Sequence, residues 1–208
     1  MRNKALWWAL CVAAVLALTA GIRALAENET PALFGGVIND YSPIAGGTTA
    51  WEVRGPWSLR LNEEAGTANF SAALTMELSV LGQSPATVLA VALNQHTHHI
   101  KMTRATVSYN PTDCPTFATA NPIARIEIRG MATVTANGGP FPPTSPTSVP
   151  SELQVCIDGG TSAETLVPYS NITLVFGSPA SGHFGLQAIH GVVRKASSLS
   201  DADEEGRR

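Results

Sequence analysis

Apolar residues recur at every second position in several separate segments of this chain, and this pattern restricts its fold more than any other feature. The clearest example spans residues 68–78, where the alternating apolar positions are Ala68, Phe70, Ala72, Leu74, Met76 and Leu78. Side chains at positions i and i+2 project from the same face of a β-strand, so each such segment predicts a strand with one buried face. Beyond residue 26 no segment has the spacing of an amphipathic helix. The sequence therefore predicts an all-β fold.

Turn residues separate the predicted strands. Residues 62–66 divide two alternating runs and predict a hairpin, and Asp158-Gly159-Gly160 divides a later pair. The predicted strands cover residues 57–61, 68–78, 98–109, 126–134, 153–157, 172–176 and 184–193. The segment 138–150 contains five prolines and predicts a long surface loop. About seven strands joined mostly by sequential turns predict an antiparallel barrel or sandwich, and the local pattern does not choose between the two.

The first residues have the layout of a signal peptide. Arg2 and Lys4 precede an uncharged run of 18 residues, and Ala24-Leu25-Ala26 offers small residues for cleavage before Glu27. The alternative is a retained membrane anchor, because the run approaches the length that spans a bilayer. The small residues at the cleavage positions and the lack of a basic stop-transfer cluster favour cleavage.

Four segments follow from these patterns. Residues 1–26 are predicted to be a signal peptide, and residues 27–50 a partly extended leader interrupted by glycine and proline. Residues 51–194 are predicted to form a single β-domain, which is long enough to bury a core. Residues 195–208 are polar and charged, and they predict a disordered tail.

Two cysteines remain after the predicted cleavage, Cys114 and Cys156. An even number of thiols in a chain sent to an oxidising compartment predicts a disulfide. Two unpaired buried thiols are the alternative. The signal peptide and the disulfide together predict that the protein lies outside the cytoplasm, either secreted or in the periplasm.

The charge balance argues against some partners. Three of the 13 basic residues and none of the 16 acidic ones precede residue 27, so the mature net charge is 10 − 16 = −6. Nucleic acid is therefore not an expected partner, and no membrane contact is expected after signal cleavage. Glu127, between Arg125 and Arg129, is interpreted as part of an exposed strand face with alternating charges.

All five histidines lie in two short segments, 96–99 and 183–190. His96 and His98 are two residues apart and would project from the same strand face, whereas His99 would face the other way. His183 and His190 are the candidates for further ligands. Imidazole suits zinc and copper, so the four residues His96, His98, His183 and His190 predict a transition-metal site. Solvated or hydrogen-bonded structural histidines are the alternative interpretation.

Two resemblances add to this reading. The segments GPWSLRL, HTHHI, NGGPFPP, SNITLVFG and GHFGLQAIHG resemble an uncharacterised family of secreted bacterial single-domain β proteins. That resemblance implies secretion and one β-domain. Locally, His96-x-His98 and Gly182-His183-Phe184 followed by His190-Gly191 resemble the histidine motifs of copper-zinc superoxide dismutases. Here the interval between the last two histidines is one residue shorter, and the aspartate motif and final copper histidine of that family are missing.

Two classes of function fit the sequence. One is a secreted β-domain whose histidines bind a transition metal; the other is a non-catalytic extracellular module that binds sugar, protein or a small apolar ligand. No G-x-S-x-G motif and no phosphate-binding glycine loop is present, so the sequence assigns no catalytic residue and leaves enzymatic activity open. The identity of the extracellular ligand is not predicted.

Overall fold

The computed structural model describes residues 31–43, 49–80, 95–115, 125–160, 165, 169–185 and 187–198. The predicted signal peptide and the last ten residues lie outside this part of the chain. Among the described residues, no helix has the length and apolar character needed to cross a membrane. Most described residues lie in strands, which are β1 (Ala32–Pro43), β2 (Thr49–Asn62), β3 (Thr67–Val80), β4 (His96–Tyr109), β5 (Arg125–Ala136), β6 (Gly139–Pro140), β7 (Ser151–Asp158), β8 (Asn171–Phe176) and β9 (Ile189–Ser198).

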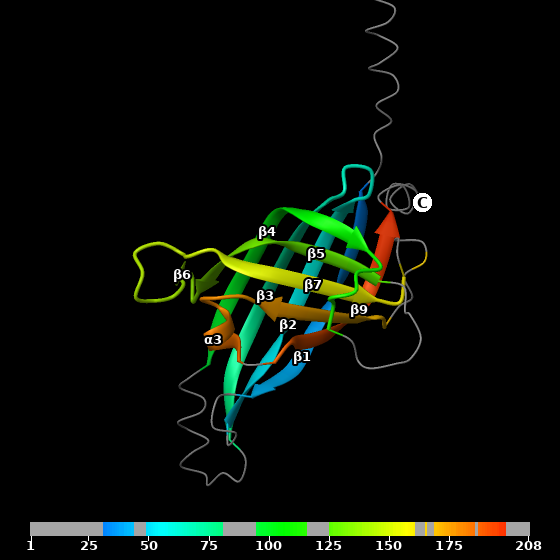
Figure 1. Ribbon diagram of the computed structural model, residues 1–208. Helices are drawn as coiled ribbons and strands as arrows, with labels where there is room; N and C mark the ends of the chain where they lie inside the picture. Colours follow the sequence, from blue (N-terminus) through cyan, green and yellow to red (C-terminus); the bar gives the residue numbers. More distant parts are fainter. Residues whose placement is uncertain are drawn as a thin grey trace, which may run out of the picture. The chain divides into compact units, whose positions relative to one another are not determined.

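Eight of these strands form a closed antiparallel barrel (Figure 1). Strands β1 to β4 pair in chain order, and so do β5, β7, β8 and β9. Pairing of β4 with β5 and of β9 with β1 closes the sheet. The ninth strand, β6, has two residues and pairs with the end of β5. The prediction of an all-β antiparallel fold is confirmed, and the barrel form is established with one more main strand than expected.

The inward faces of the strands carry the alternating apolar residues, and these fill the barrel. Leu59 on β2 lies opposite Phe70 on β3, and both are buried. Next to them the ring of Trp57 stacks on Phe70, with 6.3 Å between ring centroids. Fully burying one such side chain stabilises a fold by roughly 1.5–3 kcal/mol, so this shared core holds the barrel together. His98 on β4 lies in the same inward row as Ile100 and Met102, and all three are buried.

Strand β1 lies within the segment that the sequence analysis treats as a leader, residues 27–50. Its glycines interrupt the apolar alternation, but one of them is required by the packing of the barrel. A Cβ on Gly36 would lie 1.9 Å from the carbonyl oxygen of Val192 and 2.8 Å from Nε1 of Trp57. Glycine therefore lets β1 approach β9 and leaves space for the indole ring.

The last strand begins later than predicted. The predicted strand over residues 184–193 is replaced by a one-turn helix, α3 (Ser181–Phe184), followed by β9, which runs from Ile189 to Ser198. Gly185, with a φ of 102°, separates the two elements. The predicted strand does not form over residues 184–188 because Gly185 adopts a positive φ, which glycine permits and which interrupts an extended strand. β9 also extends four residues into the segment that was predicted to be a tail.

The barrel has two chemically different ends. We call one the histidine end; there β1, β3, β5 and β8 end, and β2, β4, β7 and β9 begin. We call the other the disulfide end; there β2, β4 and β7 end, and β3, β5 and β8 begin. Cys114 and Cys156 form a disulfide there, with 6.0 Å between their Cα atoms, which confirms the predicted pairing.

Glu127 does not lie on an exposed charged face, contrary to the interpretation of its sequence context. Glu127 is only 6% exposed. Its Oε1 accepts hydrogen bonds from the side chains of Arg129 and Gln154, each at 2.6 Å. Arg129 also pairs with Asp113, next to the disulfide. The interpretation was wrong because Arg129 on β5 and Gln154 on the neighbouring β7 both bind the carboxylate, and because Asp113 in turn contacts these two side chains.

Candidate metal centre at the histidine end of the barrel

Two of the candidate ligands lie at the start of β4. His96 and His98 are two residues apart and face inward, opposite Met76 and Leu74 of β3. His98 is completely buried, whereas His96 is partly exposed. His99 is exposed on the outer face of the strand, as the alternation predicts.

The third ligand comes from α3. The helix is fixed by backbone hydrogen bonds from Ser181 to Gly177 and from His183 to Ala180. Its last residue, Phe184, stacks on Phe176 of β8 with 4.3 Å between ring centroids and an interplanar angle of 7°. This apolar contact seats the single turn on the barrel and points His183 toward β4.

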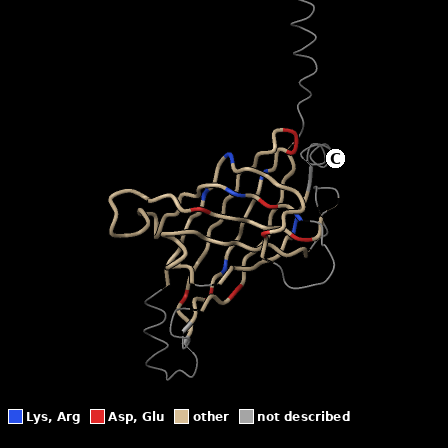
Figure 2. Tube along the Cα trace, in the orientation of Figure 1, with Lys and Arg blue, Asp and Glu red and all other residues tan. Residues whose placement is uncertain are grey.

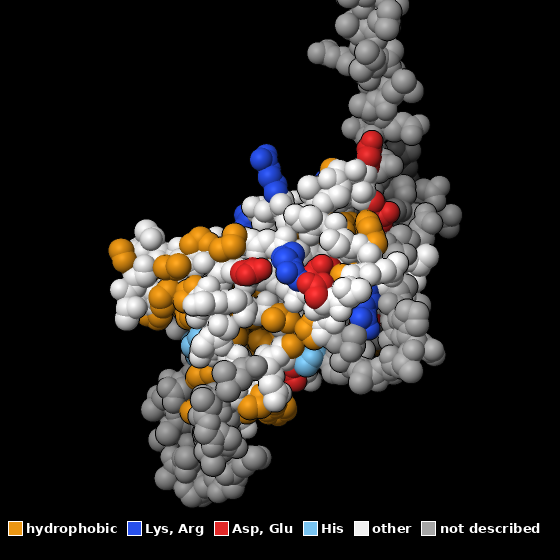
Figure 3. All heavy atoms as spheres, in the orientation of Figure 1, with side chains coloured by type: hydrophobic (Ala, Val, Ile, Leu, Met, Phe, Trp, Pro, Cys, Tyr) orange, Lys and Arg blue, Asp and Glu red, His pale blue; other side chains and the backbone are white. Residues whose placement is uncertain are grey.

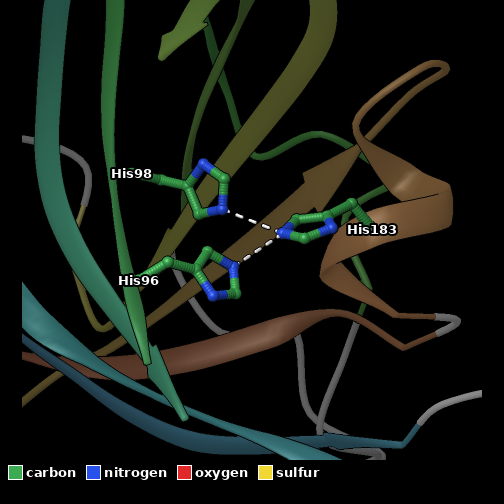
Figure 4. A group of neighbouring side chains, drawn as sticks. All are labelled: His96, His98 and His183. Atoms are coloured by element: carbon green, nitrogen blue, oxygen red, sulfur yellow. Dashed lines mark hydrogen bonds between the residues drawn. The ribbon is translucent and has the colours of Figure 1, made fainter. Parts of the chain in front are cut away.

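The three imidazoles converge on one point (Figure 4). Nε2 of His183 lies 2.9 Å from Nε2 of His96 and 2.9 Å from Nε2 of His98. A proton on His183 Nε2 can lie along only one of these two lines, whereas a cation between the rings accepts lone pairs from all three. Metal–nitrogen bonds of about 2.0–2.1 Å span a separation of this size at an angle of about 90°. Among the described residues, these three histidines form the group whose ligand atoms lie close enough together to hold a metal ion.

The backbone fixes the tautomer of His98. Its Nδ1 lies 3.0 Å from the carbonyl oxygen of Thr135, which accepts hydrogen bonds only, so Nδ1 donates. In the neutral ring the lone pair is then on Nε2, the atom that faces His183. Metal-bound histidines in proteins are held in the same way, by a hydrogen bond from the second ring nitrogen.

Aromatic rings surround the cluster. Trp51 of β2 lies 5.1 Å from His96 and 5.8 Å from His183 between ring centroids. Phe141 lies 5.3 Å from His98 and 5.1 Å from His183, and Phe184 lies 4.9 Å from His98. The two phenylalanines are buried, while Trp51 and the rings of His96 and His183 remain partly exposed. The cluster thus has an apolar floor and a more open side.

This environment keeps two of the rings neutral. The pKa of His98 is lowered to about 3, mainly by burial and also by the neighbouring His183 and His96. Burial also lowers the pKa of His183 to about 4, with a second contribution from His96. Both effects disfavour the imidazolium form. At neutral pH these two rings are therefore in the protonation state that coordinates a metal.

The fourth predicted ligand lies in a different arrangement. Nδ1 of His190 donates to Oδ2 of Asp40 at 2.7 Å, and the backbone N–H of His190 donates to the same oxygen at 2.8 Å. The structure therefore brings His96, His98 and His183 together and places His190 beside Asp40. The aromatic residues Trp51, Phe141 and Phe184 were not assigned to the site from the sequence, because they come from three separate segments without a common spacing.

None of the protein families, curated proteins or solved structures compared with this chain matches it.

Proposed function

We propose that this protein binds a divalent transition metal, zinc or copper, through Nε2 of His96, His98 and His183. The observation that carries the proposal is the convergence of these three atoms, two pairs of them 2.9 Å apart. The hydrogen bond from His98 to the Thr135 carbonyl supports it, because it presents the metal-binding nitrogen to the centre. The choice of metal rests on the ligand chemistry, since neutral imidazole suits both ions.

Calorimetric titration of tag-free protein with zinc and with copper tests this function. The parent should bind one ion per chain, and His183→Ala should weaken binding at least about 100-fold, the upper range for loss of a supporting group. His183 lies on a one-turn helix outside the sheet, so the barrel should fold without its side chain. His99→Ala is the matched control, because His99 is the next residue after His98 but is exposed on the outer face. Equal affinity in the parent and in a His96→Ala/His98→Ala variant would rule the site out.

We further propose that the protein acts after export, secreted or in the periplasm. The disulfide supports this, because such bonds persist in oxidising compartments. Detection of the mature chain beginning at Glu27 in the exported fraction is the expected result.

The alternative function, a non-catalytic binding module, has one observation in its favour. Two adjoining hollows of about 360 and 300 Å³ are lined by residues of β1 to β4, and they share Ser58, Ser71 and Lys101. Hydroxyl and ammonium groups of this kind donate hydrogen bonds to sugar oxygens. Binding of an oligosaccharide that Lys101→Ala abolishes, together with the absence of metal binding, would favour this alternative over the metal centre.

A further inference from the structure

The ligand set at the histidine end consists of neutral groups only. Among the described residues, the metal-binding cluster contains three histidines and no carboxylate or thiolate. A divalent ion held by three neutral imidazoles keeps its full charge of +2. Three protein ligands also leave the fourth position of a tetrahedral site unfilled, which is the arrangement of sites that exchange a bound ligand.

The described connections at the histidine end supply no compensating charge. Residues 137–150 and 177–185 contain no Asp, Glu, Lys, Arg or Cys. On the strands at this end, the carboxylate of Asp40 is held by His190 and that of Glu52 by Arg54. The described connections at the disulfide end, by contrast, contain Glu63, Glu64 and Asp113. Figure 2 shows the described connection between β6 and β7 without charged residues, and Figure 3 shows hydrophobic side chains gathered on it.

The immediate surroundings are also poor at screening a charge. Phe141 and Phe184 are buried beside the histidines, and His98 is completely buried. A charge in an apolar environment is unfavourable unless an opposite charge lies beside it, so an anion should accompany the metal. The partly exposed rings of His96 and His183, together with Trp51, mark the side from which such an anion enters.

We propose that the metal held by His96, His98 and His183 keeps one exchangeable position, and that this position takes the carboxylate of a small organic acid with an apolar body. The carboxylate oxygen supplies the missing ligand and the missing negative charge. The apolar body lies against the indole ring of Trp51, which lies beside both His96 and His183. This inference rests on the proposed metal-binding function and names the class of molecule that the site takes.

Cobalt-substituted full-length protein provides the test, because the visible absorption of Co²⁺ responds to a change of ligand. Titration with acetate and with benzoate should each give a saturable spectral change. Benzoate should bind about tenfold more tightly than acetate, the largest gain expected from one aromatic contact. In Trp51→Ala this preference of benzoate over acetate should fall to near unity, and Trp51→Leu should keep part of it.

The outcomes separate the two proposals. A cobalt spectrum that neither carboxylate alters would overturn the exchangeable position and leave the metal site standing. Equal binding of benzoate and acetate by the parent would overturn the apolar body, and tighter binding of sulfate than of either acid would overturn the assignment to carboxylates. Protein that gives no cobalt spectrum and shows no zinc binding in calorimetry would refute the metal site itself, and this inference with it.

Discussion

At the scale of single residues, neighbours on β4 have opposite roles. His98 is buried and donates to the Thr135 carbonyl, whereas His99, the next residue, is exposed on the outer face. The i, i+2 spacing was sufficient to predict that His96 and His98 share a face. It was not sufficient to choose between His183 and His190, because that choice depends on a turn of helix and on the Asp40 carboxylate, neither of which has a local sequence signal.

The buried ring of His98 makes the stability of the metal-free protein depend on pH. Between pH 6.5 and about 3 the unfolded chain binds a proton at residue 98, while the folded protein keeps the ring neutral. The free energy of unfolding should therefore fall as the pH falls across this interval, by about 1.4 kcal/mol per pH unit for this group. Urea unfolding of metal-free protein at a series of pH values measures the effect.

His98→Gln provides the comparison for this pH dependence, because glutamine keeps a polar side chain and does not titrate. The slope of stability against pH should be shallower in the variant than in the parent between pH 6 and 4. Identical slopes in the two proteins would mean that the ring already titrates in the folded state, contrary to its burial.

At the scale of elements, periodicity predicted the strands whose inward rows are apolar. The hairpin of β2 and β3 was predicted with its turn, because Asn62 and Gly66 are turn-forming residues that lie between two alternating runs. β1 was missed because Gly36 interrupts its inward row, although the close approach of β9 requires glycine there. The choice between barrel and sandwich could not be predicted, because closure depends on the β9–β1 and β4–β5 pairings, which local alternation does not reveal.

Two glycines at either side of His183 test whether α3 positions the ligand. A Cβ on Gly182 would have no heavy atom within 4 Å, so Gly182→Ala should stabilise the helix by about 0.4–1 kcal/mol and leave zinc affinity equal or slightly higher. A Cβ on Gly185 would lie 2.0 Å from Oγ of Ser42 and 3.0 Å from the carbonyl oxygen of Pro43, at a φ of +102°. Gly185→Ala should displace α3 and weaken zinc binding at least about tenfold.

Calorimetry and thermal unfolding of both variants measure these effects. The two substitutions add the same methyl group three residues apart, so each serves as the control for the other. If both variants bound zinc like the parent, the close approach of Gly185 to Ser42 would have no part in positioning His183.

At the scale of the whole molecule, the disulfide and the histidine cluster lie at opposite ends of the barrel. The histidine cluster lies where β4 begins and β5 ends, at His98 and Ala136. The disulfide lies toward the other end, with Cys156 opposite Glu127 in the β5–β7 pairing. Ion pairs accompany it, among them Arg125 with Asp158 at 2.7 Å. The metal site should therefore be insensitive to changes that loosen the disulfide end.

Replacing the disulfide separates these two contributions. The bond joins residues 42 positions apart and should stabilise the fold by about 4 kcal/mol in the chain-entropy model, so Cys114→Ser/Cys156→Ser should lower Tm by roughly 10 °C. Zinc affinity measured well below that Tm should stay within about twofold of the parent. His98 is held by the buried core around Ile100 and Met102, and this core does not depend on the disulfide. If the folded double variant lost zinc binding, the disulfide end and the histidine end of the barrel would instead be coupled.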